Sequence, residues 1–198
     1  MNTKIKIVFL VLIAASVLLD ANVELNAHSN ISQDTIRGQE EQTDTIRLQK
    51  IEACKGYMEW AMKNQGYGWS TTRLTPEAIV TACEENDFSI PFTLAIANLE
   101  SCFGQSQRSK KTNSVFSVGL HDNGENVCTY GTQDESVIPF INLIKKDYLQ
   151  NDTKTIDDLL RPNSFVNING HRYAQGENYE SQIKSIMKRI TRMYPILK

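Results

Sequence analysis

The stretch IPFTLAIANLESCFGQS, from Ile90 to Ser106, decides the fold, because it combines an apolar helical pattern with a single carboxylate near its end. Ser89 can cap such a helix, and Pro91 stands in the first turn, where proline is tolerated. Apolar side chains then recur at helical spacing at Phe92, Ala95, Ile96, Leu99 and Phe103. The sequence therefore predicts a buried helix that carries Glu100 near its C-terminal end.

The position of Glu100 favours the protonated form of its carboxyl group. A helix C-terminus carries partial negative charge and apolar neighbours remove water, so both effects raise the pKa of the carboxyl group. A glutamic acid that is protonated at neutral pH can donate a proton to a glycosidic oxygen as the bond breaks. From position alone the alternative is an ordinary solvent-facing glutamate at a helix end.

Helical patterns extend on both sides of this stretch. Upstream, apolar residues recur over 48–62, and Thr75 followed by Pro76 is typical of an N-cap with proline at the first helical position. Downstream, the patterns over 137–148 and 183–190 predict two further helices. The expected architecture is mainly α.

Residues 104–133 interrupt the helical patterns. They are rich in Gly, Ser, Asn and Thr, and a short hairpin is expected around Asn123 and Gly124. We expect this segment to form a small loop or β lobe that makes one wall of a substrate cleft.

The N-terminus has the layout of an export signal. Lys4 and Lys6 precede an apolar run over 7–19, which is short for a membrane span. We predict a signal peptide over 1–27, or alternatively a membrane anchor through residues 5–19. A polar linker follows over 28–45, and one catalytic domain is predicted over 46–198. The protein is thus expected to be exported, either periplasmic or secreted.

Four cysteines form an even set in a chain that is expected to enter an oxidising compartment. Pairing Cys54 with Cys83 and Cys102 with Cys128 joins neighbouring elements, so we predict these two disulfides; four buried thiols are the alternative. No Cys-x-x-Cys spacing or histidine pair indicates a metal site, and no cofactor is expected. A net charge of −2 gives no indication of nucleic acid binding.

Four motifs in order resemble a known family. LESCFGQS is similar to the E-S-G-x-G-x-S signature of bacterial N-acetylglucosaminidases and related lytic transglycosylases. NSVFSVG, TYGTQDESVIPFINLI and RYAQGENYESQIKSIM resemble the later motifs of the same family, up to about Met187. The chain departs from the pattern at Cys102, where a glycine is usual, and at Gln175, and it lacks a G-L-M-Q segment.

The resemblance implies a lysozyme-like single domain that cleaves the glycan strands of peptidoglycan, with Glu100 as general acid. It also implies that residues near the motifs bind substrate: Ser101, Ser106, Phe116, Tyr130 and Tyr173.

A hydrolase of this kind usually needs a second carboxylate. Asp122 and Glu125 are the candidates, and we predict Glu125; alternatively both are turn residues. The favoured activity is an endo-N-acetylglucosaminidase, with a lytic transglycosylase or a muramidase as its nearest rivals. A glycan-binding or assembly module without activity is the alternative from another class. The sequence does not indicate an oligomeric state.

Overall fold

The computed structural model describes residues 41–119 and 128–198. The chain divides into two units, Met1–Ile46 and Arg47–Lys198. The first unit is described from residue 41 only, where it is helical, and residues 41–64 are helical throughout. The predicted signal peptide over 1–27 and the first part of the predicted linker lie outside the described residues. Within the described ranges, no helix is long and apolar enough to cross a membrane.

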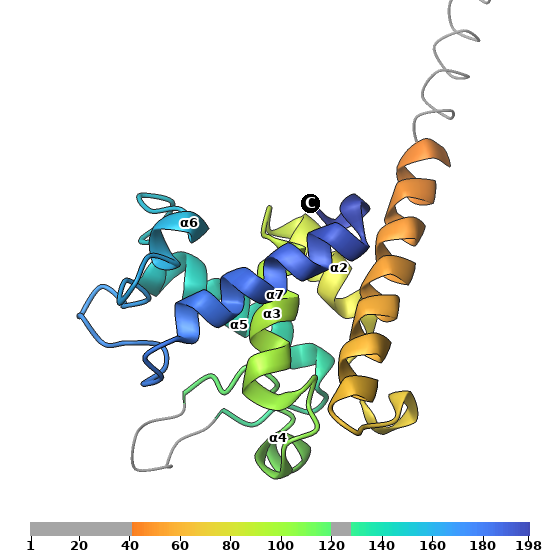
Figure 1. The fold of residues 1–198 in the computed structure, drawn as a ribbon, viewed down its shortest axis with the longest axis horizontal. Helices are drawn as coiled ribbons and strands as arrows, with labels where there is room; N and C mark the ends of the chain where they lie inside the picture. Colours follow the sequence, from red (N-terminus) through yellow and green to blue (C-terminus); the bar gives the residue numbers. More distant parts are fainter. Residues whose placement is uncertain (1–40, 120–127) are drawn as a thin grey trace, which may run out of the picture. The chain divides into compact units, whose positions relative to one another are not determined.

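Helices account for the regular structure of the second unit (Figure 1). Between residues 47 and 119 they are the helix that ends at 64, followed by η1 (Trp69–Thr71), α2 (Pro76–Glu85), α3 (Ile90–Ser101) and α4 (Gln107–Thr112). After residue 128 they are η2 (Asp134–Ser136), α5 (Val137–Leu143), η3 (Ile144–Tyr148), α6 (Ile156–Leu159), α7 (Tyr179–Met193) and η4 (Pro195–Leu197).

The predicted mainly α class is confirmed. The described segments contain no strand, and the β pairing found in them is one isolated antiparallel bridge between Val166 and Arg172. The hairpin predicted at Asn123 and Gly124 lies outside the described residues.

The two central helices begin where the sequence predicts. The Thr75 hydroxyl accepts a hydrogen bond from the Ala78 amide, 3.2 Å away, at the start of α2. The Ser89 hydroxyl accepts one from the Phe92 amide, 3.3 Å away, at the start of α3. Each helix has a proline in its first two positions, where the missing N–H would have no helical partner. Local capping chemistry therefore sets both starts.

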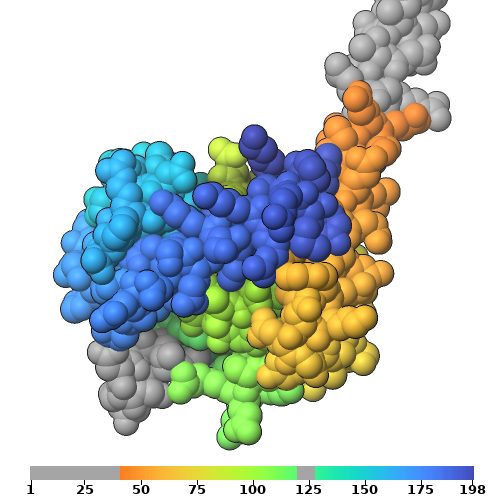
Figure 2. All heavy atoms as spheres, viewed as in Figure 1, coloured from red at the N-terminus to blue at the C-terminus, as the bar shows by residue number. Residues whose placement is uncertain are grey.

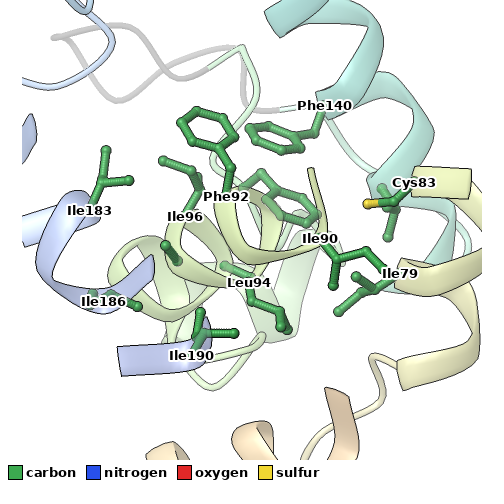
Figure 3. Close-up of a cluster of buried hydrophobic side chains, with 14 of the residues drawn as sticks. Ile79, Cys83, Ile90, Phe92, Leu94, Ile96, Phe140, Ile183, Ile186 and Ile190 are labelled. Carbon is green, nitrogen blue, oxygen red and sulfur yellow. The ribbon is translucent and has the colours of Figure 1, made fainter. Parts of the chain in front are cut away.

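α3 is the central helix of the core. It is buried from Ile90 to Ala97, with α7 on one side and α2 on the other, and α2 also packs on α5. α7 crosses α3 (Figure 1). Figure 3 shows the side chains from these four helices that meet: Ile79 and Cys83; Ile90, Phe92, Leu94 and Ile96; Phe140; Ile183, Ile186 and Ile190. α7 is amphipathic and buries one face, whereas α3 is enclosed.

The four cysteines are free thiols in the structure, so the two predicted disulfides are not found. The Cys54 sulfur lies 4.0 Å from the Met58 sulfur, and the Cys83 thiol is hydrogen-bonded to the Thr93 hydroxyl at 3.3 Å. Cys102 is buried and Cys128 is exposed. Cys54 and Cys83 therefore behave as small apolar core residues, which was the alternative interpretation.

Candidate active site

A left-handed turn ends α3 directly after Glu100 and Ser101. Cys102, Phe103 and Gly104 have φ angles of 48°, 56° and 86°, all in the region that favours glycine. The Ser101 hydroxyl accepts a hydrogen bond from the Gly104 amide at 2.8 Å and donates one to the Val115 carbonyl at 2.7 Å. The turn is thereby tied to the segment that follows α4, and Glu100 is held on the last turn of the helix.

The Glu100 carboxyl group is partly buried and receives two hydroxyl groups. The Tyr179 hydroxyl donates to Glu100 Oε1 at 2.5 Å, and the Ser117 side chain is a second hydrogen-bond partner. Burial is the largest influence on the pKa of Glu100 and raises it, while both hydrogen bonds act in the opposite direction and offset only part of the rise. No ion pair forms on Glu100 within the described residues. The site therefore favours the protonated acid.

Ser117 has an unusual backbone for a residue with a side chain. Its φ is 54°, in the left-handed region, where a non-glycine residue is strained. Strain of this kind persists where the surrounding structure imposes it, and it often marks functional sites. Here it accompanies a hydrogen bond to Glu100.

An aromatic stack supports the Tyr179 side of the carboxyl group. The Tyr173 ring lies between Phe165, with centroids 4.8 Å apart, and Tyr179, with centroids 6.0 Å apart, and both pairs are stacked. The Tyr173 hydroxyl donates to the Phe116 carbonyl at 2.7 Å. Tyr173 thus fixes the ring of Tyr179 and spans from the segment before α7 to the segment after α4.

A buried ion pair anchors this stack to α7. Glu180, which is 2% exposed, accepts two hydrogen bonds from the Arg172 guanidinium at 2.9 and 3.1 Å and one from the Phe165 amide at 3.3 Å. Arg172 also donates to the Asn163 side chain at 2.9 Å. The pair fixes the loop over 163–173 to the first turn of α7, beside Tyr179.

Glu100 opens onto a pocket of about 490 Å³, which is within the usual range for ligand sites. It is lined by Glu100, Ser106, Gln107, Arg108, Ser109, Lys111, Ser114 and Ser117. Glu100 is the one acid among these described lining residues. The surface of the α3–α4 segment, in green, emerges beneath α7 in the space-filling view (Figure 2). Across the described ranges, no three His, Cys, Asp or Glu side chains gather as metal ligands.

The structure separates the predicted site residues into two groups. Glu100 and Ser106 line the pocket, and Ser106 also caps α4 by accepting from the Ser109 amide at 3.1 Å. Ser101 and Phe116 are buried: the Ser101 hydroxyl forms the internal bonds described above, and the Phe116 ring stacks on Phe140 at 4.2 Å. Their side chains support the walls of the site.

The two predicted tyrosines are not among the residues that line the pocket. Tyr173 supports Tyr179, and Tyr130 is half-buried, with its backbone hydrogen-bonded to Thr112 and Asn113. The predicted second carboxylate, Glu125, and its rival Asp122 lie outside the described residues.

The sequence interpretation missed Tyr179 and Ser117 as partners of Glu100. Both lie in motifs quoted for the resemblance, Tyr179 as the second tyrosine of RYAQGENY and Ser117 within NSVFSVG. The repeated tyrosine could have indicated Tyr179. Nothing in the sequence separates Ser117 from the other serines of the loop-rich segment.

A comparison with known protein families assigns the chain to one of them. Residues 76–192 match the profile of the glucosaminidase family, described as mannosyl-glycoprotein endo-beta-N-acetylglucosaminidase. The match spans more than half of the chain and includes Glu100, Ser117 and Tyr179. The chain belongs to this family, and membership supports a glycosidase that acts on a glycan. No curated protein matches the chain at a significant level.

Proposed function

We propose that the protein is a peptidoglycan endo-N-acetylglucosaminidase with Glu100 as its general acid. The observation that carries the proposal is the environment of Glu100: a partly buried carboxyl group at the wall of a pocket, with hydroxyl partners in place of a cation. A carboxyl group of this kind holds its proton at higher pH than an exposed one, as proton donation to a sugar leaving group requires.

The two hydroxyl groups suit both stages of the reaction. Before bond cleavage, burial favours protonated Glu100, which donates its proton to the glycosidic oxygen. After the transfer, the carboxylate accepts hydrogen bonds from Tyr179 and Ser117, which stabilise the ionised form. The site thus limits the rise in the pKa, so that the same group can give up a proton and regain it.

For the second group we propose Glu125, which belongs to the loop-rich segment between α4 and η2. In a hydrolase this carboxylate activates water or attacks the sugar ring, depending on its distance from the acid. A transglycosylase uses a substrate hydroxyl as the nucleophile and needs Glu100 alone.

Mass spectrometry of digested, purified peptidoglycan tests the proposal. Products with N-acetylglucosamine at the reducing end are expected. Muramic acid at that end would indicate a muramidase, and an anhydro-muramic product a lytic transglycosylase. Glu100→Gln should abolish the products, whereas Glu177→Gln, which alters an exposed glutamate before α7, should not.

Two other outcomes would contradict the proposal. A wild-type protein that cleaves no peptidoglycan but binds it would support a glycan-binding module. Release of the glycan from a mannosyl-glycoprotein, with peptidoglycan left intact, would assign a different substrate within the family.

We also propose that the enzyme acts outside the cytoplasm, because a basic pair and an apolar run begin the sequence. The intact mass of the exported protein tests this. A mature N-terminus near residue 28 is expected, and an N-terminus at Met1 in the membrane fraction would instead support an anchor.

A further inference from the structure

The pocket is lined by two chemically different sets of residues. Glu100 and Ser117 belong to one set, and the other comes from α4, which contributes two basic residues, Arg108 and Lys111. A ligand that fills the pocket therefore meets both the Glu100 carboxyl group and the positive charge of α4.

The two cations have no acidic partner in the part of the chain that the structure describes. Both side chains are exposed and lie on the same side of a short helix, three residues apart. Lys110 is also exposed on α4 but does not line the pocket. The positive charge of Arg108 and Lys111 is thus available to a ligand in this pocket.

The Ser109 and Ser114 side chains also line the pocket, but their hydroxyl oxygens are enclosed and have no hydrogen-bond partner among the described residues. The exposed charged groups that α4 offers to a ligand in the pocket are therefore the side chains of Arg108 and Lys111.

We propose that the part of the pocket lined by α4 binds a carboxylate carried by the glycan, through Arg108 and Lys111. The inference rests on the proposed function, because it names a part of that substrate. In peptidoglycan, muramic acid carries a lactyl group that ends in a carboxylate when it is unsubstituted and in a peptide with its own carboxylates when it is not. A neutral polymer of N-acetylglucosamine offers neither.

Equilibrium binding to the full-length Glu100→Gln protein tests this without turnover. Three fluorescent ligands of matched length serve as probes: strands freed of peptide, strands that carry peptide, and neutral N-acetylglucosamine oligomers. The carboxylate strands should bind more tightly. Adding Arg108→Gln and Lys111→Gln should weaken the binding of the carboxylate strands about tenfold, because each exposed ion pair contributes about threefold to the affinity. The affinity for the neutral oligomers should not change. A loss on the peptide-free strands assigns the lactyl carboxylate, and a loss confined to the peptide-bearing strands assigns the peptide.

Matched variants make the result specific. Lys110→Gln should change nothing, and Arg108→Lys with Lys111→Arg should keep the preference because the charge is kept. The proposal is overturned if the double Gln variant still prefers the carboxylate strands, or if it loses affinity for the neutral oligomers to the same extent. It is also overturned if Lys110→Gln causes an equal loss of affinity for the carboxylate strands. Cleavage by the wild type is a separate measurement, so failure of the proposed function is distinguishable from failure of this site.

Discussion

Glu100 and Glu180 flank the same contact between α3 and α7, but their surroundings differ in charge. Glu100 lies in the last turn of α3, at the negative end of the helix dipole, and its partners are the hydroxyls of Tyr179 and Ser117. Glu180 lies in the first turn of α7, at the positive end, and pairs with Arg172. The comparison shows that one fold can hold one glutamate in an ion pair and keep a second, the proposed acid, with hydroxyl partners alone. The difference between the two sites is a countercharge.

The largest effect should come from removing the proton of Glu100. Glu100→Gln keeps the size of the side chain and its hydrogen-bonding capacity, so the fold should persist. Turnover on peptidoglycan should fall at least about a hundredfold, the low end for loss of a general acid. The initial rate of release of soluble fragments measures this. A folded variant with near wild-type turnover would remove Glu100 from the mechanism.

A change at Glu180 should act on stability instead. Glu180→Gln leaves the Arg172 guanidinium without a countercharge, and breaking a fully buried pair costs about 3–5 kcal/mol. Because the Arg172 side chain is 24% exposed, we expect a smaller loss in the free energy of unfolding, about 2 kcal/mol. Urea denaturation measures it, with Glu177→Gln as the control, which should stay within about 0.5 kcal/mol of the wild type. If Glu180→Gln matches that control, the ion pair does not anchor the loop over 163–173.

Tyr179→Phe should show how much the Tyr179 hydroxyl contributes to the pKa of Glu100. The ring and its stacking are kept, but the hydrogen bond that favours ionised Glu100 is lost, so the pKa of Glu100 should rise further. Activity that needs the protonated acid is lost as pH rises through this pKa, and the alkaline limb of the pH–rate profile should therefore move to higher pH. The maximal rate should fall about tenfold, as expected for a hydrogen bond to a charged group.

Tyr173→Phe is the control for this prediction. It removes the hydrogen bond to the Phe116 carbonyl and leaves the partners of Glu100 in place. The alkaline limb should stay where it is in the wild type. A shift of equal size in both variants would show that packing, and not the Tyr179 hydroxyl, sets the pKa of Glu100.

The smallest expected effect is a pH-dependent gain in stability for Glu100→Gln. Burial raises the folded-state pKa of Glu100 above the ordinary value of a glutamate carboxyl group, so ionisation is less favourable in the folded protein. This penalty is absent below the unfolded-state pKa, grows as pH rises toward the folded-state pKa, and is constant above it. The variant should thus match the wild type in thermal stability at pH 4 and equal or exceed it at pH 7. A variant that is less stable at pH 7 than at pH 4, relative to the wild type, would contradict the direction of this shift.

Local patterns predicted much of the fold. The caps at Thr75 and Ser89 and the apolar stripe of α3 are short-range signals, and the structure begins both helices there. α4 was missed because its sequence, QRSKKT, has no apolar stripe. Its start depends on one serine cap, at Ser106, in a segment rich in turn-forming residues.

The site was predicted less completely, because its decisive contacts are distant in sequence. The hydrogen bond between Tyr179 and Glu100 spans 79 residues, and it depends on how α7 crosses α3. No periodicity within either helix specifies that crossing. Glu180 and Arg172 are closer in sequence, but their pairing was also missed. Glutamate usually lies on the solvent-exposed face of an amphipathic helix, so nothing in the sequence indicated that Glu180 would be buried. Glu100 was predictable because its helix, its neighbours and its motif all lie within one short stretch.

The left-handed turn after α3 limits which amino acids positions 102 and 104 can accept. A side chain at Cys102 is tolerated although its φ of 48° carries a conformational penalty of about 1–2 kcal/mol. At Gly104 a Cβ atom would collide with the Gln133 side chain, so backbone and space both demand glycine. In a saturation library, position 102 should therefore accept several small residues, and position 104 should accept glycine alone, because shortening Gln133 would free the space but would not remove the backbone requirement. Of the two glycines in the family's signature, the first can be replaced by a residue with a side chain, and the second cannot.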